Sequence, residues 1–249
     1  MITFPRIVIT CILLASGLVM PVSAQKVRKE TIDSQGKKRT YYLLVPDTTT
    51  PEHPAPVVLL LHGSGRDGLS LMDKWKDLGV KEGIVLVAPN ANSSEGWNVP
   101  IDGPDFLHDL LSEIKAKYSI DSRRMYLFGH SAGAGFALYM SLYESEYFAA
   151  AAIHAGALRH NDAPIVEQAS RKIPFHIAVG DVDPFFPLVA VRATRDLLVK
   201  NGFQVELVEM KGHNHWYYDL APQINAAAWE FLKQRKLADE PRYVQYSFK

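Results

Sequence analysis

Cysteine is almost absent from this 249-residue sequence, because Cys11 is the only one and it lies within an N-terminal apolar run. If processing removes that run, the remaining chain has no disulfide and no thiol nucleophile. We therefore expect the hydrophobic core alone to hold the fold together. The apolar fraction of 47% supplies ample material for such a core.

An excess of charge of either sign is also absent. Lysine and arginine total 27, aspartate and glutamate total 27, and the longest basic run is Lys37-Lys38-Arg39. Proteins that bind nucleic acids carry a clear basic patch, so we expect no nucleic-acid partner. The charged fraction of 22% is ordinary for a folded soluble protein, and a disordered, collagen-like or coiled-coil chain is excluded.

Only one apolar run raises the question of a membrane. It spans 14 residues, Ile7 to Met20, follows a single basic residue, and is ended by a proline before Val22-Ser23-Ala24. These are the parts of a secretory signal peptide cleaved after Ala24. A retained anchor is the alternative, but a membrane span needs about 20 apolar residues. We predict a signal peptide over 1–24, export to the periplasm or the medium, and no membrane anchor after cleavage.

Beyond that segment, fully apolar runs alternate with helical periodicity. Runs that are apolar at every position predict strands buried on both faces, and apolar residues three or four apart predict amphipathic helices. We expect strands at 41–45, 57–61, 84–88, 125–128, 149–153, 175–179 and 205–209, and helices at 69–80, 105–117, 132–143, 188–200 and 221–235. This alternation predicts a mainly parallel, doubly wound α/β sheet with helices on both faces. Residues 25–249 contain no repeat and are expected to form one domain.

The segment Gly129-His130-Ser131-Ala132-Gly133 carries the first chemical signal. The pattern G-x-S-x-G is weak alone, but here it follows a predicted buried strand and precedes a predicted helix of small residues. That strand–turn–helix setting presents the serine hydroxyl at the carboxyl edge of the sheet. The turn is so tight that glycine is needed two residues to either side. A serine that merely caps the helix is the alternative reading.

A nucleophilic serine needs a base and an acid that orients the base. Both should come from later loops at the same edge of the sheet. Asp181 and Asp183 follow the strand at 175–179, and His213 and His215 follow the strand at 205–209. The order Ser, Asp, His is the chain order of α/β-hydrolase triads. A metal pair formed by the two histidines lacks a third ligand of clear spacing, so we expect no metal.

The transition state also needs backbone donors for its oxyanion. We expect one to be the amide of Ala132, at the helix N-terminus, and the other the amide of Ser64. Ser64 lies between glycines after the strand at 57–61, although an ordinary tight turn would also explain those glycines. Trp97, Phe185 and Trp216 lie in loops at the same edge, where they are candidates for an apolar acyl or aryl pocket or for packing alone.

Taken together, these residues give the chain a family resemblance over about residues 38 to 235. It resembles α/β-hydrolases of the polyhydroxybutyrate depolymerase and feruloyl/acetyl-xylan esterase group, and it is similar to the esterase D group. The motifs are Leu61-His62-Gly63-Ser64-Gly65, Gly129 to Gly133, Gly180-x-x-Asp183, His213-x-His215 and Tyr118-x-x-Asp121-x-x-Arg124. The resemblance implies Asp183 as the orienting acid. The esterase D pattern selects His215 as the base and the depolymerase pattern selects His213; we favour His215.

The resemblance implies a serine ester hydrolase that acts through an acyl-enzyme and needs no metal or organic cofactor. Only 21 residues separate the strands at 149–153 and 175–179, too few for the large cap of many lipases. An open site suits short-acyl or aryl esters, free or linked to a polysaccharide, and no polymer-binding module is found. The alternatives are an acyltransferase, a peptidase and a binding module. A peptidase of the prolyl-oligopeptidase type would carry a propeller domain, which is absent here. A binding module would not need a complete triad.

Overall fold

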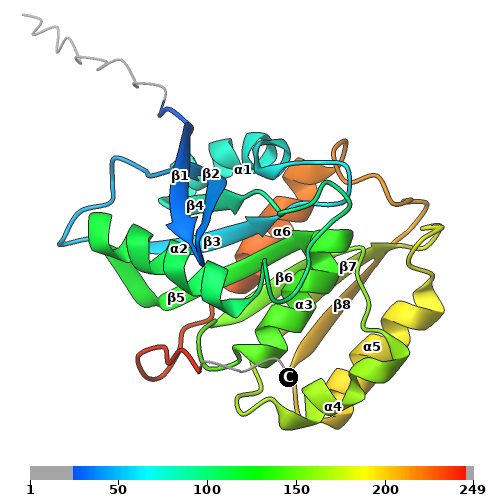
Figure 1. Ribbon diagram of the computed structural model, residues 1–249. Helices are drawn as coiled ribbons and strands as arrows, with labels where there is room; N and C mark the ends of the chain where they lie inside the picture. The colour runs from blue at the N-terminus through cyan, green and yellow to red at the C-terminus, as the bar shows by residue number, and fades with distance from the viewer. Residues whose placement is uncertain (1–24, 245–249) are drawn as a thin grey trace, which may run out of the picture.

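A computed structural model describes residues 25–244. Within these residues, eight strands form one sheet with the order β1-β2-β4-β3-β5-β6-β7-β8 (Figure 1). The strands are β1 (Arg28–Ser34), β2 (Lys37–Leu44), β3 (Ala55–Leu61), β4 (Val85–Pro89), β5 (Ile120–His130), β6 (Ala150–His154), β7 (Phe175–Gly180) and β8 (Val205–Met210). From β4 through β8 every neighbouring pair is parallel, and β1 and β2 add antiparallel pairs at one edge. The predicted mainly parallel sheet is confirmed. The predicted signal peptide, 1–24, lies outside the described residues.

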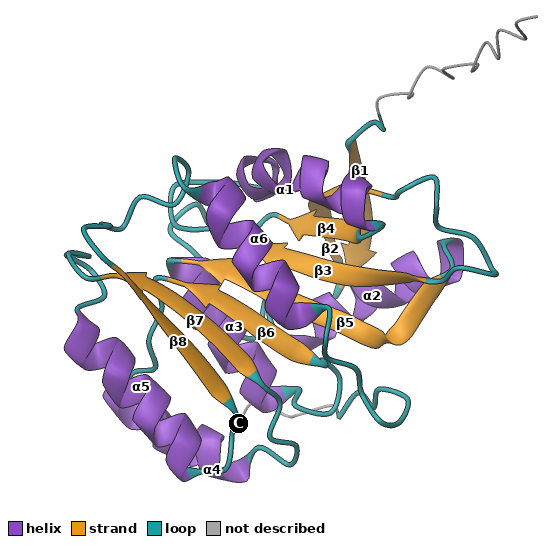
Figure 2. Ribbon diagram, turned by 180° about the vertical axis from the view of Figure 1, so that it is seen from behind, coloured by secondary structure: helices purple, strands orange, loops and turns teal. Residues whose placement is uncertain are grey.

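Helices cover both faces of the sheet, as the sequence predicts. They are α1 (Gly68–Glu82), α2 (Pro104–Lys117), α3 (Ala132–Tyr143), α4 (Ala163–Gln168), α5 (Leu188–Lys200) and α6 (Ala221–Leu232). Figure 1 shows α2 and α3 in front of the sheet, and Figure 2, from behind, shows α1 and α6 across the opposite face. A short 3₁₀ turn and α4 are the only helical elements between β6 and β7, so no large cap is present in the described chain.

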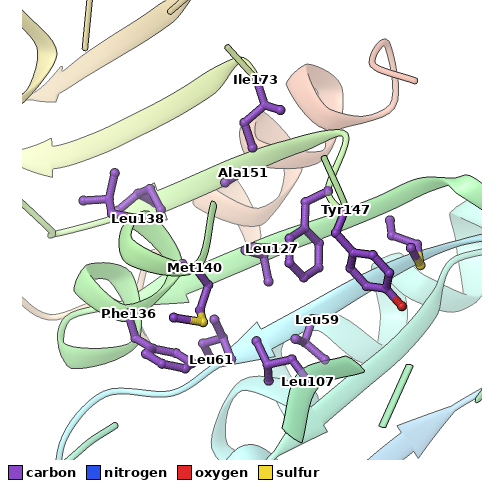
Figure 3. Close-up of a cluster of buried hydrophobic side chains, with 14 of the residues drawn as sticks. Leu59, Leu61, Leu107, Leu127, Phe136, Leu138, Met140, Tyr147, Ala151 and Ile173 are labelled. Atoms are coloured by element: carbon purple, nitrogen blue, oxygen red, sulfur yellow. The ribbon is translucent and has the colours of Figure 1, made fainter. Parts of the chain in front are cut away.

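Two apolar clusters lie on the two faces of the sheet. Leu59 and Leu61 of β3 enter the cluster beneath α2 and α3, which Figure 3 shows with Leu107 and Phe136. The alternate residues of β3, among them Leu60, enter the cluster beneath α1 and α6. Because successive side chains of a strand point to opposite faces, a strand covered on both sides must be apolar throughout.

The structure also contains a strand that the sequence analysis did not predict. β1 is mostly polar, and of its residues only Ile32 and Ser34 are buried. It pairs with β2 through a two-residue turn in which Gln35 and Gly36 have φ angles of 51° and 72°. A turn with two positive φ angles matches the twist of a hairpin. Periodicity missed β1 because an edge strand buries little apolar surface.

Candidate active site

The chain turns sharply at Ser131, between β5 and α3. Ser131 has φ 57° and ψ −119°, a region that non-glycine residues rarely adopt. A Cβ on Gly129 would lie 2.2 Å from the Gly133 carbonyl oxygen, and a Cβ on Gly133 would lie 1.9 Å from the Leu61 carbonyl oxygen. Both positions therefore require glycine. The Ser131 amide donates a hydrogen bond to the His154 carbonyl at 3.1 Å, which fixes the turn against β6.

Three side chains from the carboxyl ends of β5, β7 and β8 meet in one line. His215 Nε2 lies 2.8 Å from Ser131 Oγ, and His215 Nδ1 lies 2.9 Å from Asp183 Oδ2. Asp183 is buried, and its Oδ1 accepts hydrogen bonds from the Phe185 and Phe186 amides at 2.8 and 3.0 Å. With Nδ1–H donating to the carboxylate, Nε2 is left to accept the hydroxyl proton of the serine. This arrangement can activate a serine nucleophile.

The competing acid and base candidates lie elsewhere in the same loops. Asp181 is exposed, and its Oδ1 accepts the Gly212 amide at 2.6 Å, so it links the loop after β7 to the loop after β8. His213 is buried, with its Nε2 3.1 Å from Nε2 of His154. Neither side chain joins the line through Ser131. Within residues 25–244 no three potential ligands gather as a metal cluster.

His213 belongs to a histidine bridge formed by His130, His154 and His213. Nδ1 of His130 lies 2.9 Å from Nδ1 of His154, whose Nε2 contacts His213. All three rings are buried. Burial lowers the pKa of His130 to about 3 and that of His154 to about 2, and burial also lowers the pKa of His213. At neutral pH the bridge is therefore uncharged, and each neutral ring can donate through one nitrogen and accept through the other.

The histidine bridge passes close to the candidate base. The His130 ring centroid lies 5.1 Å from that of His215, in tilted contact. The sequence analysis did not identify this bridge. A signal for it existed, because both are the last residues of neighbouring parallel strands and are paired in register. Their side chains therefore emerge on the same face of the sheet.

The predicted oxyanion donors lie beside Ser131. Ala132 is the first residue of α3, and Ser64 lies in the loop after β3. A Cβ on Gly63 would lie only 3.2 Å from Cβ of Ser131, so this loop runs directly against the serine turn. Among the hydrogen bonds of the described residues, none is donated by the Ser64 or the Ala132 amide. Both amides are thus available to a ligand.

The three candidate substrate-binding aromatic residues differ in how exposed their side chains are. Phe185 is 70% exposed with its ring centroid 4.8 Å from that of His215, and Trp216 is 45% exposed. Trp97 is half-buried, stacks on Phe136 at 4.9 Å between ring centroids, and donates from Nε1 to the His62 carbonyl at 2.8 Å. Phe185 and Trp216 therefore present exposed aromatic surface near the candidate base, whereas the Trp97 ring is held in place by its contacts with Phe136 and His62.

The order of elements defines the class of protein. The serine turn follows β5, the aspartate follows β7 and the histidine follows β8, on an eight-stranded and mostly parallel sheet without a large cap. This is the α/β-hydrolase fold. A family profile described as "Putative esterase" matches residues 32–221, more than half of the chain. The chain belongs to this esterase family.

The names of two individual relatives are consistent with this family. A bifunctional acetylxylan esterase/xylanase from Neocallimastix patriciarum is 28% identical over 106 residues, which cover 41% of this chain and 16% of the relative. A poly(3-hydroxybutyrate) depolymerase from Ralstonia pickettii is 27% identical over 137 residues, covering 47% and 28%. The match thus spans less than a third of the length of either relative.

A solved structure extends the likeness to the fold. The ferulic acid esterase of Anaeromyces mucronatus, in complex with ferulic acid, superposes with a TM-score of 0.65 at 18% identity, over 82% of this chain and 90% of that one. At this identity the likeness concerns the fold alone. The predicted resemblance to feruloyl and acetyl-xylan esterases and to polyhydroxybutyrate depolymerases is confirmed.

In the described part of the chain, no helix is both long and apolar enough to cross a membrane.

Proposed function

We propose that the protein is a serine esterase that acts through Ser131, His215 and Asp183 and forms an acyl-enzyme. The observation that carries the proposal is the continuous line of hydrogen bonds, 2.8 Å from Ser131 Oγ to His215 and 2.9 Å from His215 to Asp183. A serine hydroxyl is a weak nucleophile at neutral pH, and a histidine in this position removes its proton during attack.

The reaction proceeds in two acyl transfers. Ser131 Oγ attacks the ester carbonyl while His215 Nε2 takes its proton, and Asp183 stabilises the resulting imidazolium. The amides of Ser64 and Ala132 bind the oxyanion, and each such donor contributes about 10²–10³-fold to kcat. His215 then gives its proton to the departing alcohol oxygen. Water attacks the acyl-enzyme by the same route and releases the acid with Ser131 restored.

We propose short-acyl or aryl esters as the substrates, free or linked to a polysaccharide. The exposed rings of Phe185 and Trp216 offer stacking surface beside the site. The absence of a large cap over the described residues leaves room for a bulky alcohol. An acetylxylan esterase among the relatives and the ferulic acid bound by the structural neighbour agree with this substrate class.

We also propose that the catalytic domain, 25–249, is exported. The support is the sequence of residues 1–24, with its short apolar run and small residues before the expected cleavage site. Substrates linked to a polysaccharide would be met outside the cytoplasm. Cell fractionation with mass spectrometry of each fraction tests this: we expect a mature N-terminus at Gln25 outside the cytoplasm, and protein with an intact Met1 confined to the cytoplasm would contradict the proposal.

The proposed activity is tested with purified residues 25–249 beside Ser131→Ala. The panel contains acetyl, butyryl, octanoyl and feruloyl esters, acetylated xylan and a peptide amide. We expect serine-dependent cleavage of the short or aryl esters, and a folded Ser131→Ala protein by circular dichroism with turnover reduced by about 10⁴-fold or more. Activity that persists in Ser131→Ala would contradict the nucleophile assignment.

The remaining outcomes separate the alternatives. Preferential cleavage of the amide would indicate a peptidase, and transfer to an added alcohol in preference to water would indicate an acyltransferase. If no substrate of the panel is hydrolysed but an organophosphonate still labels Ser131, the triad is competent and the natural substrate is a different one. If there is neither hydrolysis nor labelling, the protein is a binding module.

A further inference from the structure

The loop between β4 and α2, residues 90–103 and here called the β4–α2 loop, lies against the segment that carries the second oxyanion donor. The Gly65 amide donates to the Ser94 carbonyl at 2.7 Å, and Ser64 Oγ donates to the Glu95 carbonyl at 2.6 Å. Ser64 is therefore bonded to this loop through its own side chain and through the next amide. Its own amide remains without an acceptor in the described chain.

The same loop also fixes His62, two residues before Ser64. The Ala91 amide donates to His62 Nε2 at 3.1 Å, and Trp97 Nε1 donates to the His62 carbonyl at 2.8 Å. His62 is buried, and its Nδ1 donates to the Gly63 carbonyl at 2.9 Å. With both ring nitrogens engaged, the ring is a neutral spacer between the loop and the oxyanion segment.

A buried ion pair closes the β4–α2 loop on itself. The Asp102 carboxylate accepts the Asn92 amide at 2.9 Å and the Asn98 amide at 2.8 Å, and thus joins both ends of the part that contacts Ser64. Arg39, on β2, lies 2.5 Å from Asp102. The Arg39 side chain is 6% exposed and that of Asp102 is fully buried.

The remaining contacts of Arg39 also go to the loop and its flank. The guanidinium donates to the Ile101 carbonyl at 2.9 Å and to the Asn90 carbonyl at 3.0 Å. It also lies over the ring of Phe106, 3.7 Å from its centroid. A buried ion pair is weak evidence for stability, because desolvation offsets the attraction. Here the donors and acceptors of the pair are used to shape one loop.

We propose that Arg39 and Asp102 are positioning residues for the oxyanion hole: they fix the β4–α2 loop, which in turn holds the Ser64 amide where the oxyanion forms. This inference rests on the proposed esterase function. The amide of Ala132 is fixed by α3, but Ser64 lies in an exposed loop with no strand or helix of its own. An oxyanion donor is useful only within about 2.7–3.1 Å of the developing charge, so a shift of about 1 Å removes most of its effect.

The test compares Asp102→Asn with a matched control, Asp121→Asn. Asp121 is also a carboxylate paired with an arginine, 2.8 Å from Arg124, but at the start of β5, the opposite end of the strand from Ser131. Using an acetyl or aryl ester that the wild type cleaves, we expect Asp102→Asn to lower kcat about 10- to 100-fold with KM within about twofold, because a misplaced oxyanion donor affects the transition state and not substrate binding. Asp121→Asn should leave both constants unchanged.

A second variant guards against misfolding. Ser64→Ala removes the hydroxyl contact with Glu95 and keeps the amide, at an exposed position. We expect kcat of Ser64→Ala to fall about three- to tenfold at constant KM. The double variant, Asp102→Asn with Ser64→Ala, should show a smaller fall in kcat than the product of the two single falls, because both substitutions act on the position of one amide. If Asp102→Asn does not give a folded protein by circular dichroism, Arg39→Lys takes its place with the same expectation, because a lysine keeps the positive charge but lacks the fork that bonds Asp102, Ile101 and Asn90 together.

The inference is overturned if the folded variants keep kcat within twofold of wild type, or if KM rises while kcat is unchanged. Multiplicative losses in the double variant would overturn it too, because they would mean independent actions. Failure of the proposed function gives a different result, namely wild-type turnover that survives Ser131→Ala. That outcome would remove the oxyanion hole and the positioning role together.

Discussion

The two sides of Ser131 are held in place by different kinds of interaction. On the side of His215, the strand ends are joined by the histidine bridge, three buried rings whose pKa values are lowered by burial. On the side of the proposed oxyanion donors, the β4–α2 loop is held by the buried ion pair of Arg39 and Asp102. One support consists of neutral rings, and the other is a buried ion pair.

The difference suits the chemistry on each side. In the proposed mechanism His215 takes up a proton during each acyl transfer, and a permanent positive charge among its neighbours would oppose that step. A bridge of neutral imidazoles supports the base without adding charge. The proposed oxyanion amides undergo no protonation change, so a buried ion pair can support their loop without opposing the reaction. Under the proposed mechanism, the support of each group is therefore matched to whether that group changes its charge.

The largest effect expected on the base side distinguishes its two histidines. His215→Ala removes the ring between Ser131 and Asp183, so we expect kcat to fall by about 10⁴-fold or more. His213→Ala breaks only the bridge to His154, and we expect a loss of about tenfold with the triad intact. Steady-state kinetics on a cleaved ester measures both. A larger loss in His213→Ala than in His215→Ala would make His213 the base.

The next effect separates the two acids. Asp183→Asn should lower kcat about 10³- to 10⁴-fold, because an amide at this position favours the wrong tautomer of His215. Asp181→Asn keeps an oxygen that can accept the Gly212 amide, so we expect kcat within about threefold of wild type. The same ester assay, with melting temperatures as a check on folding, measures both variants. Equal losses would mean that the loop contact and the orienting contact cannot be separated.

Much of this site could be predicted from local sequence. The Ser131 turn requires glycines at fixed offsets, and Asp183 lies in the loop three residues after the end of β7, so both positions are visible in the printed sequence. The sequence could only favour His215 over His213, because two residues along an irregular loop define no direction for a side chain. The structure adds the distance, 2.8 Å from His215 to Ser131.

The support of the site could not be predicted in the same way. Arg39 and Asp102 are 63 residues apart, and nothing in the sequence around either marks a buried pair. Arg39 was noticed only as the end of a basic run, which suggests a solvated surface. Such partners are selected by the path of the chain in three dimensions, whereas motifs and periodicity report local geometry.

The smallest effect tests the neutral character of the histidine bridge through acid stability. The folded-state pKa values of His130 and His154, about 3 and about 2, lie below the ordinary value of 6.5. Between pH 6.5 and 3 the unfolded chain therefore binds protons that the folded chain does not. Each residue then lowers the free energy of unfolding by about 1.4 kcal/mol for each pH unit below 6.5 and has no such effect above it.

Replacing one member of the bridge should remove its share of that slope. His154→Gln cannot be protonated and retains one donor and one acceptor, so between pH 6 and pH 4 we expect its stability to fall less steeply than wild type, by about 1.4 kcal/mol per pH unit. Urea unfolding at several pH values measures the slope, and His53→Gln, at an exposed position, is the matched control. Equal slopes in wild type and His154→Gln would mean that His154 is charged in the folded protein. Both sides of Ser131 would then be supported by charged groups.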